Sequence, residues 1–96
     1  MRSVYLVAYD ISDAKRLKAM HRCMLGFGDA LQYSLFRCVL SAKEKLMMVE
    51  AAKEVINQRE DSVMVVCMGP VEGKADERLE FLGLRMNISE RRALIV

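Results

Sequence analysis

The chain has 96 residues, of which 53% are hydrophobic and 29% charged, with a formal net charge of +2. The length and composition indicate one small folded domain and argue against a disordered chain. The net charge is too low to argue by itself for binding to nucleic acid. Three cysteines without C-x-x-C spacing (Cys23, Cys38 and Cys67) argue against a zinc site and a disulfide framework, and are predicted to be buried thiols. No signal peptide or membrane span is expected, so we predict a cytoplasmic protein.

The first third of the chain changes from a strand pattern to a helix pattern. Residues 4–9 are β-branched, aromatic and apolar on both parities, which predicts a central strand. A polar turn over residues 10–13 follows it. From Ala14 the apolar residues recur with helical spacing, and Gly26 and Gly28 are expected to end this helix.

The rest of the chain repeats that order and adds a tail. Residues 31–40 predict two short strands with a kink near Ser34. Ser41 and Glu44 form a capping box for a helix to about Gln58, with Leu46 facing inward. Residues 62–68 predict a buried strand, residues 79–84 a weaker one, and the apolar residues 93–96 a segment docked on a sheet edge.

This β-α-β, β-α-β order predicts the α+β class and a ferredoxin-like βαββαβ sandwich. We expect a single domain over residues 1–96, with a core of about 1–78 and a dimer-completing extension of about 79–96 whose strand completes the partner subunit's sheet. The sheet face without helices is too apolar for water, which favours a homodimer.

Asp10 is the best candidate for chemistry, because it ends the first strand directly before a helix. Asp10, Ser12 or Asp13 could instead simply cap that helix. One carboxylate binds Mg²⁺ poorly, but Asp10 from each subunit could share one ion near a two-fold axis. Such an ion would polarise a phosphodiester or lower the pKa of a bound water.

Basic residues on the first helix suggest phosphate contacts without base readout. The alternative is an ordinary solvated helix face. The strand aromatics Tyr9, Tyr33 and Phe36 could stack on bases only if they were exposed on the open sheet face. Most such residues lie in the core, where Phe36 is expected, and His21 is expected at the surface or its boundary. The candidate phosphate contacts are Lys15, Arg16, Lys18, Arg22 and Arg37, which Arg91 and Arg92 could extend.

An ordered set of short motifs resembles the small CRISPR-associated Cas-two (Cas2) family over nearly the whole chain. The motifs are Tyr9-Asp10-Ile11-Ser12, Lys15-Arg16-Leu17, Gly28, Gln32-Tyr33-Ser34-Leu35-Phe36-Arg37-Cys38, Asp61-Ser62-Val63 and Gly83.

The resemblance implies a symmetric dimer that bridges the Cas-one family integrase and holds prespacer DNA during spacer acquisition. It also implies a metal-dependent endonuclease on RNA or double-stranded DNA, with Asp10 as the catalytic carboxylate and ligand of Mg²⁺ or Mn²⁺. Tyr9, Arg16, Ser34 and Phe36 match positions that shape the cleft or brace the dimer.

Two other functions fit the same fold. The first is a toxin-like endoribonuclease that cuts messenger RNA alone. The second is a regulatory dimer with a small-molecule pocket at its interface. An integrase gene beside this one would favour adaptation, whereas a small antitoxin gene would favour the toxin.

Overall fold

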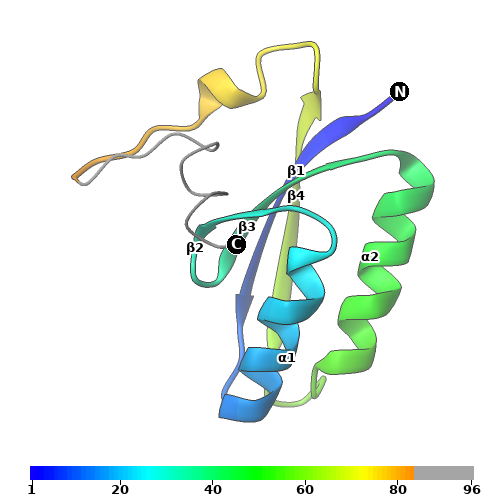
Figure 1. Ribbon diagram of the computed structural model, residues 1–96, viewed down its shortest axis with the longest axis vertical. Coiled ribbons are helices and arrows are strands. Elements are labelled where there is room, and N and C mark those ends of the chain that lie inside the picture. The colour runs from blue at the N-terminus through cyan, green and yellow to red at the C-terminus, as the bar shows by residue number, and fades with distance from the viewer. Residues whose placement is uncertain (84–96) are drawn as a thin grey trace.

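Two helices cover one face of a four-stranded antiparallel sheet (Figure 1). The computed structural model describes residues 1–83. The elements are β1 (Ser3–Asp10), α1 (Ala14–Leu25), β2 (Asp29–Gln32), β3 (Leu35–Leu40), α2 (Ala42–Val55), β4 (Ser62–Pro70) and the short 3-10 helix η1 (Asp76–Arg78).

The strand order β2-β3-β1-β4 confirms the ferredoxin-like sandwich predicted from the element order. β1 lies between β3 and β4 and runs antiparallel to both. Its last residue, Asp10, pairs with Ser62 at the start of β4. The two βαβ halves therefore bring the end of β1 next to the junction between α2 and β4.

The core lies between the sheet and the helices. α1 buries Met20 and Met24 completely, as its apolar spacing predicts. α2 buries Met48 and Ala52, but Leu46 is 62% exposed, so its predicted inward position is wrong. Each residue of an α-helix is rotated by about 100° from the one before it. Leu46 and Met48 are two positions apart, so they lie on nearly opposite sides of α2.

A close approach of the chain to β3 explains why a glycine follows α1. A Cβ atom on Gly28 would lie 2.3 Å from the carbonyl oxygen of Arg37 and 2.6 Å from the Sγ atom of Cys38. No side chain fits there without moving backbone. The buried Cys38 agrees with prediction, whereas Cys67 is exposed because it lies on β4 beyond Val65, the last β4 residue packed on the core.

One predicted boundary and one predicted strand are wrong. α2 ends at Val55, before Gln58, because Ile56 adopts an extended backbone with ψ of 156°. The weak strand predicted over residues 79–84 is absent from 79–83, which have no regular secondary structure, and Leu84 lies outside the described residues. The docked tail at 93–96 and the predicted contacts of Arg91 and Arg92 also lie outside them.

The sheet face without helices keeps apolar side chains. In the register, Leu6 of β1 pairs with Val66 of β4, and Ala8 pairs with Met64. Met64 is 61% exposed. Strand alternation places these residues opposite Val7, which belongs to the helix-side core. We call Leu6, Ala8, Met64 and Val66 the open-face patch.

The segment after β4 returns over another part of this open face. Asp76 of η1 pairs with Arg37 of β3, at 2.7 Å from Nε and 2.8 Å from Nη2. Val4 and Ala75 are buried, although neither belongs to the helix-side core. Across residues 1–83, none of the helices combines the length and the apolar character that crossing a membrane requires.

The capping box at the start of α2 is confirmed. The Ser41 hydroxyl accepts from the Glu44 N–H at 3.2 Å, and the Glu44 carboxylate accepts from the Ser41 N–H at 2.8 Å. Replacing Ser41 with alanine should lower the free energy of unfolding by about 1 kcal/mol, because a helix N–H loses its acceptor. Urea denaturation measures this, with Lys43→Ala as the control. An equal loss in both variants would contradict the capping role.

Candidate nucleic-acid and metal site

Asp10 lies exposed at the end of β1. The residue that caps α1 is Asp13, whose carboxylate accepts from the Arg16 N–H at 3.0 Å. Capping therefore does not account for Asp10. Within residues 1–83, the Asp10 carboxylate has no hydrogen-bond or ion-pair partner, so its oxygens remain available to a ligand.

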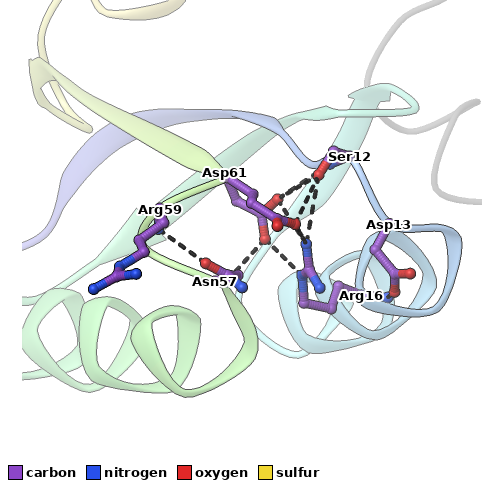
Figure 2. Close-up of polar contacts among 7 residues, drawn as sticks. Ser12, Asp13, Arg16, Asn57, Arg59 and Asp61 are labelled. Carbon is purple, nitrogen blue, oxygen red and sulfur yellow. Dashed lines mark hydrogen bonds and ion pairs between the residues drawn. The ribbon is translucent and has the colours of Figure 1, made fainter.

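Asp61 is the centre of a polar network that joins the start of α1 to the turn after α2 (Figure 2). Its side chain is fully buried. The carboxylate accepts from the Arg16 Nε at 2.8 Å and from the backbone N–H groups of Asn57 at 2.8 Å and Ser12 at 3.1 Å. The hydrogen bond from Arg16, helped by those from the two backbone groups, holds the pKa of Asp61 well below its usual range.

Arg16 faces this network and not solvent. Its Nη2 atom also lies 3.0 Å from Glu60, and its side chain is 26% exposed. The hydrogen bond to Asp61 raises the pKa of Arg16, so the guanidinium stays charged. Arg37 is engaged in the same way by Asp76. Two of the predicted phosphate contacts are therefore internal ion pairs, while Lys15, Lys18 and Arg22 are exposed on α1.

Tyr9, Ser34 and Phe36 come together next to Asp10. The Tyr9 N–H donates to the Ser34 carbonyl at 3.1 Å, and the Tyr9 and Phe36 rings lie 6.2 Å apart. Phe36 is completely buried, which confirms its place in the core. Burial raises the pKa of Tyr9 to about 12, so its hydroxyl stays protonated and donates to the Tyr33 carbonyl at 3.0 Å. The Ser34 carbonyl and the two packed rings therefore hold the strand end that carries Asp10.

The described residues do not form a complete metal site in one chain. No group of three or more His, Cys, Asp or Glu side chains that could hold an ion occurs in residues 1–83. By itself, Asp10 offers the oxygens of one carboxylate, which is the right ligand type for Mg²⁺ or Mn²⁺. A second copy of Asp10 would give two carboxylates, a number that suits Mg²⁺ together with water and phosphate oxygens.

Sequence reasoning missed the Asp61 network and the surroundings of His21. Arg16 and Asp61 are 45 positions apart, so no local spacing signals their contact. His21 was expected at the surface or its boundary. It is half-buried, and its ring stacks on Tyr33 with 4.8 Å between centroids.

Sequence comparisons find relatives that match most of this chain. The family model described as CRISPR associated protein Cas2 matches residues 2–72. A CRISPR-associated endoribonuclease Cas2 of Rhodospirillum rubrum is 35% identical over 96% of this chain and 89% of that protein. One of the same name from Geobacter sulfurreducens is 33% identical over the full length of both.

Solved structures show the same fold. Cas2 of Streptococcus pyogenes superposes with a TM-score of 0.74 and 25% identity, over 83% of this chain and 99% of that one. A hypothetical protein from Thermus thermophilus has a TM-score of 0.73 and 26% identity, over 88% and 94% of the two chains. The family model, the full-length relatives and the fold agree: the chain belongs to the CRISPR-associated protein Cas2 family.

Proposed function

We propose that this chain is a cytoplasmic CRISPR adaptation protein. It acts as a homodimer that bridges the Cas-one family integrase and holds prespacer DNA during spacer acquisition. Membership of the Cas2 family supports this role. The observation that carries the nucleic-acid part is the exposed Asp10 carboxylate, without a partner among the described residues, at the start of the turn into basic helix α1.

Asp10 also makes the chain a metal-dependent endonuclease candidate. Relatives from two organisms are named endoribonucleases, which supports cleavage of RNA, and double-stranded DNA is the other substrate. The two Asp10 carboxylates of the dimer would hold one Mg²⁺ or Mn²⁺, which polarises a phosphodiester and activates water when bound. Lys15, Lys18 and Arg22 hold backbone phosphates beside it. Action on RNA without the integrase, as in a toxin-like ribonuclease, is the second candidate function.

The open-face patch is the proposed dimer surface. A single chain leaves Met64 and Val66 in water, where burial against a second copy would remove apolar area at a gain of about 25 cal/mol per Å². Dimerisation is also what brings two Asp10 residues within reach of one ion. The scaffold and the metal site therefore depend on the same association.

Met64→Asp should convert the dimer to a monomer, because a charge would be buried without a partner in the interface. Multi-angle light scattering measures the mass of the chain alone, with integrase and with duplex DNA. Leu46→Asp is the matched control, since Leu46 is 62% and Met64 61% exposed, but Leu46 lies on α2.

The expected results are a wild-type dimer, a larger complex with the integrase, and loss of both in Met64→Asp alone. Circular dichroism checks that both variants remain folded. A wild-type monomer at micromolar concentration, a dimeric Met64→Asp, or no association with the integrase would contradict the scaffold.

A further inference from the structure

Tyr33 presents an aromatic face to solvent near the end of β1. It lies in the turn between β2 and β3, and its side chain is 55% exposed. One face of the ring stacks on His21, with planes 13° apart. His21 in turn meets Phe36 edge-on, at 5.3 Å between centroids. The exposed ring therefore stands on a stack anchored in the core.

Hydrogen bonds fix the turn that carries this ring. The Tyr33 carbonyl accepts from the Tyr9 hydroxyl at 3.0 Å, and the His21 Nδ1 atom lies 3.2 Å from the same oxygen. The next carbonyl, of Ser34, accepts from the Tyr9 N–H at 3.1 Å. Tyr9 is the second-to-last residue of β1, so the turn that carries the ring is held at the end of this strand. Binding of a ligand to the Tyr33 ring would therefore cost little side-chain entropy.

Positive charge flanks the stack. Lys18 lies one helical turn before His21 on α1, and Arg22 is the residue after it. Both are exposed. Neither has a hydrogen-bond or ion-pair partner among residues 1–83, unlike Arg16 and Arg37. Two exposed cations on the helix that carries His21, with an aromatic ring stacked on that histidine, match the way proteins bind single strands, with stacked bases and backbone phosphates held by charge.

We propose that Tyr33 is a stacking platform for one unpaired nucleobase, with the strand's phosphates along Lys18 and Arg22. The inference rests on the proposed nucleic-acid function and deepens it, because it assigns a residue that contacts a base to the turn between β2 and β3. A base within a duplex has both faces covered by its neighbours, whereas an unpaired base offers a free face. The ring accepts the bases of RNA and DNA alike.

Fluorescence anisotropy tests this with the full chain and labelled oligouridylate, oligothymidylate, an abasic counterpart and a DNA duplex. Tyr33→Ala should weaken binding of both single strands by about five- to a hundredfold, the usual range for a stacked base. Tyr33→Phe keeps the ring and should bind as the wild type does. Met47→Ala, at a residue 54% exposed on α2, is the control.

The abasic strand separates stacking from a general structural effect. It should bind wild type and Tyr33→Ala equally, because the base that Tyr33 would contact is missing. Duplex binding should not change. The RNA and DNA arms show whether one strand type is preferred.

Several results would overturn the platform. These are no single-strand binding by the wild type, equal binding by Tyr33→Ala, a loss in Tyr33→Phe as large as in Tyr33→Ala, and the same loss with the abasic strand. Intact duplex binding and integrase association alongside any of them would leave the adaptation role standing. Loss of the dimer and of the integrase complex would instead defeat the proposed function itself.

Discussion

Asp61→Asn is expected to lower the melting temperature by on the order of 10 °C, because it leaves the Arg16 guanidinium beside a neutral, buried amide. Asp61 accepts from the Asn57 and Ser12 N–H groups as well as from Arg16. An asparagine side chain has only one oxygen to serve these donors, and its amide brings two donors of its own. Several polar groups are then left without partners in a buried place.

Thermal unfolding followed by circular dichroism at pH 7 measures the loss. Glu60→Gln is the matched control, since Glu60 pairs with the same arginine at 3.0 Å but is 57% exposed. A solvated ion pair contributes little, so this variant should melt close to the wild type. Equal losses in the two variants would show that burial of Asp61 is not what matters.

The same pair makes stability depend on pH. Folding lowers the pKa of Asp61 below its value in the unfolded chain, chiefly through the hydrogen bond from Arg16. The folded chain thus binds fewer protons than the unfolded chain in acid. The contribution of Asp61 is full above a pH of about 4 and is lost as the pH falls further. The stabilities of wild type and Asp61→Asn should therefore converge in acid, and a constant gap would contradict this.

The Asp61 network also bears on the candidate site. Asp61 binds the backbone of Ser12, two residues after Asp10, and Ser62 pairs with Asp10 itself. The turn that carries the candidate metal ligand is therefore fixed at both of its sides. Arg16 contributes to the site by holding this turn, which is a different role from the phosphate contact that its place in a basic run suggests.

Elements with strong local signals were predictable from the sequence. The β-branched and aromatic run of β1, the apolar stripe of α1 and the capping box at Ser41 each reflect a pattern or a contact within a few residues. The kink near Ser34 separates β2 from β3 as expected. The order of these elements then determines the fold class, because few topologies satisfy it.

The errors concern contacts between distant segments. Asp61 and Asp76 each take up an arginine from far along the chain, and no spacing rule connects them. The helical spacing of apolar residues predicts Leu46 in the core, although Met48 and Ala52 set the buried side of α2. Asp10 was identified because of its place at a strand end, which is a local feature. Only the structure shows that Asp13, and not Asp10, caps α1.

Asp10→Asn should reduce metal-dependent cleavage by at least about a hundredfold, the scale of losing a group that stabilises developing charge in the reaction. An amide has the shape of the carboxylate but not its charge, and Mg²⁺ binds neutral oxygens in its place poorly. The assay follows labelled single-stranded RNA and double-stranded DNA with Mg²⁺ or Mn²⁺, and chelation by EDTA should remove cleavage by the wild type.

Stability separates this prediction from that for Asp61. The Asp10 carboxylate is exposed and has no hydrogen-bond or ion-pair partner in residues 1–83, so Asp10→Asn should melt and dimerise as the wild type does. Glu54→Gln, at an exposed carboxylate on α2, should retain full activity. Cleavage lost in Asp10→Asn alone assigns the chemistry to the end of β1. No cleavage by the wild type at any pH or metal, or equal cleavage by both proteins, would defeat the catalytic role. The dimer would then act as a scaffold, because neither folding of the chain nor its dimerisation requires Asp10.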